Sequence, residues 1–272
     1  MFIDLDSGRL VVFLGGFLLL LLLEVLIPLR TQDQQRLKRF SLHLVIAACN
    51  TVVIRLLAFV PLLLWTVHVD QQGWGISRWL GLYGWVEICA SIIVLDAFDY
   101  AWHRANHRLP FLWRFHKAHH ADTRMDLSTS LRFHPGELLI SALVKAGWVA
   151  AWGPTAVAWF LFEILVSLCA QFHHANIHLP EGLERFLAPV LVTPAYHAAH
   201  HLADRRYGDN NFATIFPAWD RLFGTRVGTK APIGDGGVYG LPEGRETALQ
   251  PVEWLIEPVR SRNLKLSSGE RS

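Results

Sequence analysis

Histidines gather in four short clusters along this chain. Two clusters repeat the spacing HxxHH, in FHKAHH and YHAAHH, and the other two are WHRANH and HHANIH. On a helix, residues at i, i+3 and i+4 share one face, so an HxxHH triplet can direct imidazoles at two neighbouring metal ions. Neutral imidazole binds iron, zinc, copper and nickel, whereas calcium and magnesium require oxygen ligands. The repeated spacing therefore predicts a site for two transition metals.

Ten of the fourteen histidines belong to these clusters. They are His103, His107, His116, His119, His120, His174, His178, His197, His200 and His201. An isolated histidine is commonly a packed or solvated side chain, and His43 and His68 belong to that class. His173 is offset from the cluster spacing by one position, which favours a packing or hydrogen-bonding role.

Polar neighbours of the clusters are candidates to orient the ligands. Metal-bound imidazoles normally donate their second N–H to a carboxylate or a carbonyl group. Asp99 is the best placed, one helical turn before His103, although it could instead pair with a cation. The other carboxylates considered are Asp96, Glu137, Asp209 and Asp220. His134 precedes Pro135 and is expected to act as a hydrogen-bond partner of the site, with a ligand or turn role as alternatives.

Composition indicates which elements must carry these clusters. The chain is 52% hydrophobic and 18% charged, with positive mean hydropathy, which is typical of a polytopic membrane protein. Apolar stretches cover residues 10–29, 41–67, 79–101 and 137–173. The last contains Gly153 and Pro154 and is long enough for a helical hairpin. We expect an all-α protein with about four to five membrane helices, and no nucleic-acid partner, because no basic tract is present.

Charge places the clusters on one side of the membrane. The loop from Arg30 to Phe40 holds four Lys and Arg residues against one Asp, which predicts a cytoplasmic position. Counting crossings from there, a hairpin over 137–173 returns the chain to the cytoplasm before His174. A single crossing in that stretch would separate the clusters across the bilayer, so a shared site requires the hairpin.

These inferences predict a single integral membrane domain over residues 1–272. Membrane helices lie within 10–101, a first histidine segment of the cap covers 102–136, and the membrane hairpin covers 137–173. A second histidine segment of the cap covers 174–225. Residues 226–272 form a cytoplasmic tail, amphipathic at VEWLIEPV and then disordered, which either lies on the membrane surface or docks on the cap.

The motifs resemble those of the membrane-bound fatty acid hydroxylase and sterol desaturase superfamily. Its signature is HxxxH or HxxxxH, then HxxHH, then a second HxxHH, and this chain contains each element in that order. The similarity extends through DAFDYAWHRANH, RFHPGE, HHAN, TPAYHAAHH and NNFATIFPAWDRLFGT, from about Asp96 to Thr225. The motifs are specific for the superfamily and carry little information about the substrate.

The resemblance implies an oxygen-dependent oxidoreductase in which two ferrous ions, held by the clustered histidines, activate O2 against an unactivated C–H bond of a lipid. Zinc could replace iron in purified material. Rebound of oxygen would give an alcohol, and a second hydrogen abstraction would give a double bond, so hydroxylation is expected and desaturation is the alternative. The resemblance makes His178 the less certain ligand, because Asn176 could reach a metal through water at that point.

The chain has no GxGxxG loop, no CxxCH motif and no cysteine set for an iron–sulfur cluster, so a separate electron donor of ferredoxin, rubredoxin or cytochrome type is expected. The absence of a fused haem domain and of a retention signal favours a bacterial inner membrane, with the endoplasmic reticulum as the alternative. Two rival classes are a metal transporter, which would place ligands near the bilayer midplane, and a membrane zinc hydrolase, which would act without oxygen.

Overall fold

The computed structural model of the chain describes residues 2–32, 34–227 and 231–260. Within these ranges the regular structure is helical, and the extended segments form two isolated bridges but no strand. The long helices are α1 (Phe2–Leu26), α2 (Arg36–Ile54), α3 (Val60–Gln72), α5 (Gly84–Arg108), α7 (Pro135–Trp152) and α8 (Ala156–His174). A π-helical turn, η1 (Arg55–Phe59), joins α2 to α3. The predicted all-α fold is confirmed.

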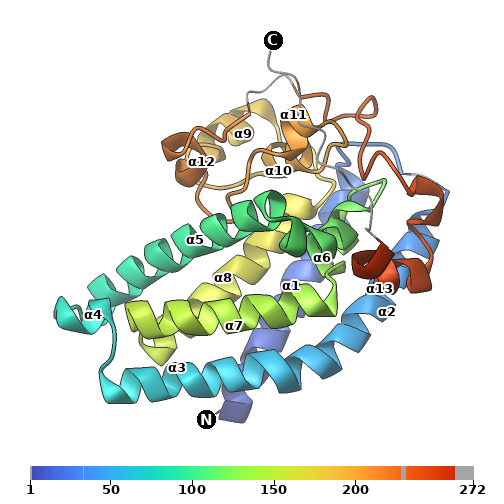
Figure 1. Cartoon of the computed structure of the whole chain (residues 1–272). Coiled ribbons are helices and arrows are strands. Elements are labelled where there is room, and N and C mark those ends of the chain that lie inside the picture. The colour runs from blue at the N-terminus through green and yellow to red at the C-terminus, as the bar shows by residue number, and fades with distance from the viewer. Residues whose placement is uncertain (1, 33, 228–230, 261–272) are drawn as a thin grey trace.

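Short helices build a cap at one end of the long ones (Figure 1). They are α6 (Pro110–His120), η2 (Leu127–Leu131), α9 (Glu181–Leu187), α10 (Pro194–His200), α11 (Arg205–Gly208), α12 (Ala218–Leu222), η3 (Arg245–Thr247) and α13 (Pro251–Arg260). One further short helix, α4 (Ile76–Trp79), lies at the opposite end of the long helices. The amphipathic segment of the tail forms α13, which packs on α6 through the buried Trp254. The part of the tail expected to be disordered lies outside the described residues.

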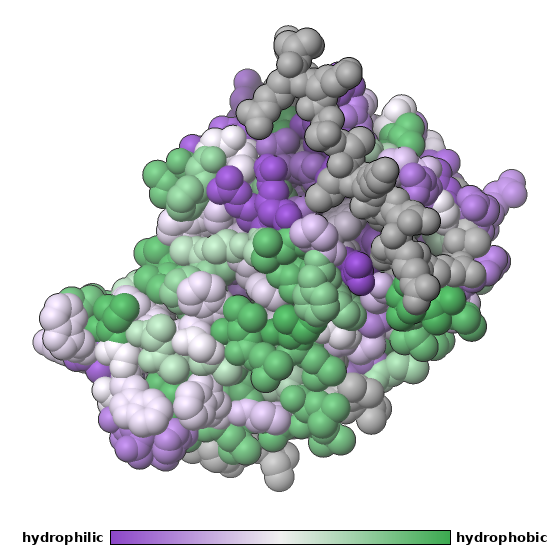
Figure 2. All heavy atoms as spheres, viewed as in Figure 1, coloured by the Kyte–Doolittle hydropathy of each residue, from purple (hydrophilic) through white to green (hydrophobic). Residues whose placement is uncertain are grey.

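Three described segments are long and apolar enough to cross a membrane: Gly8–Leu26, Arg36–Trp79 and Ala156–His174. Helices α5 and α7 were also predicted to cross, but they contain charged residues such as Glu87 and Lys145 and do not meet that standard. Figure 2 shows apolar side chains over the long helices and polar ones over the cap. On this face the long helices therefore present a mainly apolar surface and the cap a mainly polar one.

The bend between α7 and α8 is locked to the turn that follows α3. Gly153 has φ +73°, and a Cβ there would lie 1.8 Å from the carbonyl oxygen of Trp74. The Ser77 hydroxyl donates to the Gly153 carbonyl, and the Thr155 hydroxyl donates to Glu87 at 2.8 Å. From this bend α7 and α8 diverge (Figure 1). Consequently the start of α7 and the end of α8 both lie at the cap.

A carboxylate on α5 anchors the second half of the cap. Asp96 is fully buried and accepts hydrogen bonds from the backbone N–H groups of Ile215 and Phe216, each at 3.1 Å. It also accepts one from the Trp219 indole at 2.8 Å. Three donors on one buried carboxylate fix the segment that leads into α12 against α5.

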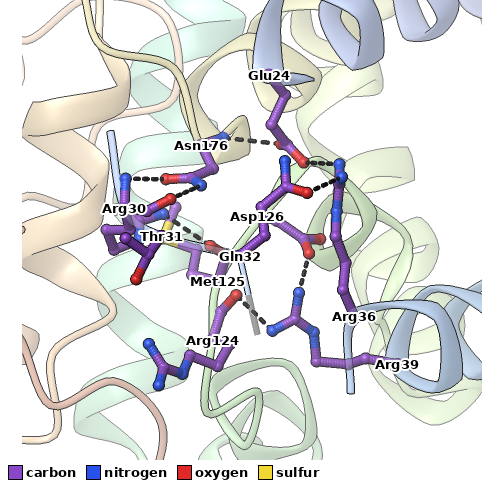
Figure 3. A pocket seen from close by; sticks show the side chains of 10 residues that line it. All are labelled: Glu24, Arg30, Thr31, Gln32, Arg36, Arg39, Arg124, Met125, Asp126 and Asn176. Atoms are coloured by element: carbon purple, nitrogen blue, oxygen red, sulfur yellow. Dashed lines mark hydrogen bonds and ion pairs between the residues drawn. The ribbon is translucent and has the colours of Figure 1, made fainter. Parts of the chain in front are cut away.

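A second anchor joins α1 to the cap at a polar hollow (Figure 3). Glu24 is 1% exposed and accepts hydrogen bonds from the backbone N–H groups of Leu127 and Asn176, at 2.8 and 2.9 Å. Its other oxygen pairs with Arg36 at 2.7 Å. The carboxylate of this otherwise apolar helix is therefore an interhelical partner, and it positions the chain immediately after α8.

We predict that Asp96→Ala destabilises the protein by about 2–4 kcal/mol, because three buried donors lose their acceptor. The expected result is a clear fall in the unfolding midpoint of the detergent-solubilised protein, followed by fluorescence-detected size exclusion after heating. Glu243→Ala, at an exposed carboxylate of the cap, is the control and should leave the midpoint within error. An unchanged midpoint for Asp96→Ala would show that the cap is held by other contacts.

Candidate metal centre

All four histidine clusters meet where the long helices enter the cap. The first cluster lies at the end of α5, the second at the end of α6, the third at the end of α8, and the fourth in α10. Pro110 begins α6 immediately after α5, so the chain reverses without a long loop. Thr193 caps α10 by accepting from the backbone N–H of Tyr196, with Pro194 at the first helical position. Proline and cap residues therefore set the directions of the helices that carry the two HxxHH motifs.

The structure brings nine of the ten candidate histidines into two adjacent groups. In each group the ring nitrogens lie within 4.8 Å of one another. The first group is His103, His107, His116, His120 and His200, and the second is His119, His174, His197 and His201. The rings of His120 and His201 stack at 4.4 Å between centroids, so the two groups are in direct contact. This is the two-site arrangement that the HxxHH spacing predicts.

In the first group, oxygen acceptors orient three imidazoles through Nδ1. His103 contacts the Phe212 carbonyl at 2.8 Å, His200 contacts the Asn210 carbonyl at 2.6 Å, and His116 contacts Glu137 at 2.7 Å. The Nε2 atoms of these three histidines are buried and have no hydrogen-bond partner in the described part of the chain. An imidazole with Nδ1 bound to oxygen and a bare, buried Nε2 is arranged as a metal ligand.

In the second group, His174 lies between His119 and His197. Its Nδ1 lies 2.7 Å from the Ala170 carbonyl, one turn back along α8. Its Nε2 lies 3.1 Å from Nε2 of His119 and 3.2 Å from Nε2 of His197. His201 Nε2 is a further 3.2 Å from His197 Nε2. Four ring nitrogens thus point at one small volume.

Burial keeps these imidazoles neutral. The pKa values of His119, His120, His197 and His201 lie well below the ordinary histidine value. The main cause is loss of solvent on burial, and the neighbouring imidazoles add a smaller effect in the same direction. Burial lowers the pKa of His200 to about 3. Neutral imidazole is the form that binds metal, and a purely nitrogen donor set suits transition metals rather than calcium or magnesium. The residues fit two such ions.

His178 is a correction to the sequence-based ligand set. Its side chain is exposed, and it is not part of either group. The helical spacing from His174 does not apply because α8 ends at His174 and the following chain is extended, with the N–H of His178 donating to the carbonyl of Ile27 at 2.8 Å. His173 is buried beside the site, with its ring 4.0 Å from that of His197.

The three residues expected to support the ligands all act elsewhere. Asp99 lies 3.6 Å from Lys145 and accepts no hydrogen bond from a histidine in the described residues. His134 caps α7 by accepting from the N–H of Gly136 at 3.0 Å. Asn176 bonds the backbone of Arg30 on both sides, at 2.9 and 2.8 Å.

Other groups orient the histidines instead. Glu137, one of the carboxylates considered from the sequence, accepts a hydrogen bond from His116 Nδ1 at 2.7 Å, whereas Asp209, another of them, lies 3.5 Å from His107 Nδ1 without a hydrogen bond. The carbonyl groups of Asn210 and Phe212 were missed, because backbone acceptors have no residue-type signature. The NNFA segment that contains them was nevertheless part of the resemblance, and Asn211 has φ +56°, which turns this loop toward the site.

Comparison with known proteins agrees with this geometry. A model of the "Fatty acid hydroxylase" family matches residues 88–225, just over half of the chain and all nine grouped histidines. The chain belongs to the fatty acid hydroxylase family. No solved structure matches it significantly.

Characterised members of the fatty acid hydroxylase family are similar to this chain. Alkylglycerol monooxygenase of Danio rerio is 33% identical over 62% of this chain and 36% of its own length. Methylsterol monooxygenase 2-2 of Arabidopsis thaliana is 28% identical over 67% of this chain and 71% of its own length. Ornithine lipid hydroxylase OlsE of Rhizobium tropici is 24% identical over 51% of this chain and 41% of its own length. The chain spans about a third of the alkylglycerol monooxygenases it matches. These relatives are named as monooxygenases or hydroxylases, in keeping with the oxidoreductase class expected from the motifs.

We predict that the protein loaded anaerobically with iron holds two ions per chain, because the two groups are separate and each has at least four nitrogen donors. His103→Ala should reduce the content toward one ion, since it removes a ligand of the first group alone. His178→Ala, the same substitution at an exposed histidine, should retain two. Plasma mass spectrometry of purified protein measures these contents, and a loss in His178→Ala equal to that in His103→Ala would contradict the assignment.

Glu137→Leu should weaken metal binding at the first group by about 10–100-fold, because His116 loses the acceptor that fixes its orientation. Glu137→Gln should restore part of the affinity, since an amide oxygen still accepts the Nδ1 proton. Titration of the metal against a competing chelator gives both values. Equal affinities for the wild type and Glu137→Leu would show that Glu137 does not support this ligand.

Proposed function

We propose that this chain is an oxygen-dependent lipid hydroxylase whose centre consists of two iron ions held by the nine grouped histidines. One observation carries the proposal: two all-nitrogen groups lie in contact, so two redox metals would be close enough to act on one O2 molecule. The relatives named as monooxygenases and hydroxylases of alkylglycerols, methylsterols and ornithine lipids support a lipid substrate.

The overall reaction would convert R–H, O2, two electrons and two protons to R–OH and water. Bound iron would supply the redox chemistry that breaks the O–O bond and attacks an unactivated C–H bond. The chain itself would supply orientation through the Phe212, Asn210 and Glu137 oxygens, and exclusion of water by burial of the histidines. Dry surroundings protect a reactive centre from side reactions.

Access to the centre would be at His103. His103 is partly exposed as a residue, although its Nε2 is buried, whereas the other eight members of the two groups are buried. His103 lies near the end of α5, whose preceding turns lead away from the cap toward the α4 end of the long helices (Figure 1). A lipid would therefore approach from the membrane side of the centre.

The two rival classes fit less well. A hydrolytic zinc ion normally takes three protein ligands and leaves most of nine histidines without a role. Transporters place their ligands near the bilayer midplane on broken helices, whereas these groups lie at helix ends under the cap. Desaturation would use the same centre and is distinguished by its product.

Charge and packing support a centre that faces the cytoplasm. The basic loop after α1 contacts the same end of the molecule as the histidines, because Arg30 donates to the Met125 carbonyl and Arg39 pairs with Asp126 in the first cap segment. A positive loop favours the cytoplasmic side. A separate ferredoxin, rubredoxin or cytochrome would deliver the electrons there.

The test compares lipid extracts of cells that express the wild type, His200→Ala or His178→Ala together with a ferredoxin and its reductase, each with and without oxygen. We predict a lipid with one added oxygen, formed by the wild type and His178→Ala in the presence of oxygen and reduced to background in His200→Ala. Mass spectrometry detects it. Loss of two hydrogens would instead identify a desaturase, and a product that persists without oxygen would overturn the oxygenase proposal.

A further inference from the structure

Charged side chains from four helices meet in the apolar part of the protein. Lys145 of α7 lies 3.0 Å from Glu163 of α8 and 3.6 Å from Asp99 of α5. Arg9 of α1 reaches the other oxygen of Glu163 at 4.0 Å and stacks over the Phe59 ring. We call Asp99, Lys145 and Glu163 the charged cross-bar, because they connect α7 and α8 at a point where these helices are diverging from their bend (Figure 1).

The cross-bar lies next to the accessible side of the metal centre. Asp99 precedes His103 by four residues on α5, so the two share a face about 6 Å apart along the helix axis. His103 is the ligand that is not fully buried. Lys145 follows Glu137, which contacts His116, by eight residues on α7, or about 12 Å. A lipid that reaches the centre past His103 therefore lies against the cross-bar.

The three side chains of the cross-bar lie between helices but remain partly exposed. Its side chains retain 16%, 17% and 14% exposure for Asp99, Lys145 and Glu163. Charges in an apolar region are costly and typically mark a functional position. An alkyl chain packed over these atoms would remove their remaining hydration without replacing its hydrogen bonds, which is unfavourable. Charged side chains that keep part of their surface exposed thus favour a ligand with a polar group at this depth.

The charges indicate which polar group fits. Two cations, Lys145 and Arg9, balance two carboxylates, so the cluster has no net charge to attract an anionic or cationic headgroup. An ammonium group has three donors, and each carboxylate has several acceptor positions. A hydroxyl both donates and accepts, so it can bond to this mixture without adding charge.

We propose that the charged cross-bar binds a hydroxyl group of an uncharged lipid substrate and thereby places a C–H bond a few bonds away beside His103. This inference rests on the proposed function, because it assumes that the lipid is oxidised at the adjacent centre. It makes Lys145 and its two carboxylates determinants of substrate specificity, in addition to a link between the helices that carry the ligands.

Binding is measured separately from turnover, with the iron-loaded protein in nanodiscs. The probes are two matched pairs: radiolabelled 1-O-hexadecylglycerol with its dimethyl ether, and cholesterol with its methyl ether. Methylation removes the hydroxyl donor and leaves the rest of the molecule. For at least one pair, the wild type should bind the free hydroxyl form about tenfold or more tightly.

Lys145→Met should bring that preference to below about twofold, because the donor is lost. Asp99→Asn/Lys145→Met keeps the charge balance and should lose the preference as well, with iron content unchanged. Arg78→Met removes a cation from the ion pair with Asp70 at the far end of the long helices and should preserve the preference. These variants separate recognition from general loss of an ion pair.

Equal binding within both probe pairs by the wild type would overturn the inference. It would also be overturned if the double variant retained the preference, or lost iron and both members of each pair together, since the cross-bar would then be a structural link alone. Oxygen-dependent turnover of the bound probe is scored independently. Preference without turnover would contradict the proposed function and leave the hydroxyl site established.

Discussion

The whole arrangement depends on keeping nine imidazoles packed in contact with one another beneath the cap. Several of their ring nitrogens have no hydrogen-bond partner in the described part of the chain, a costly state that bound metal would relieve. Polar contacts around the centre fix the segments that carry these histidines. Asp96 fixes the second cap segment on α5, and Glu24 fixes the chain that leaves α8, so neither half of the ligand set can move away from the other. Backbone carbonyls then set the directions of individual rings.

The same helices join the centre to the lipid phase. Because α7 and α8 share a locked bend and diverge from it, one arm supports His116 through Glu137 and the other ends in His174. The charged cross-bar connects these arms below the centre. In the proposed site, the depth of the bound substrate hydroxyl relative to His103 would decide which C–H bond of the lipid lies beside the metal centre.

Local spacing predicted much of the site, and long-range contacts decided the rest. Histidines within α5, α6 and α10 follow helical periodicity, so their convergence could be expected from sequence. His178 lies outside both groups because α8 ends four residues earlier, at His174, and the spacing of the histidines alone does not reveal that helix end. For Asp99 the alternative considered from the sequence, pairing with a cation, is the one found, but its partner Lys145 is distant in sequence and could not be named from spacing. The number of crossings was also harder to predict, because α5 and α7 carry buried charges whose partners the sequence does not show.

The central claim is that the two histidine groups bind two metals that act as one centre. Mössbauer spectroscopy of protein loaded with isotopically enriched ferrous iron, before and after oxygen exposure, tests it most directly. The account predicts two nitrogen-ligated high-spin ferrous ions per chain that become a magnetically coupled pair on oxidation. A single bound iron, or two ferric ions without magnetic coupling, would contradict it.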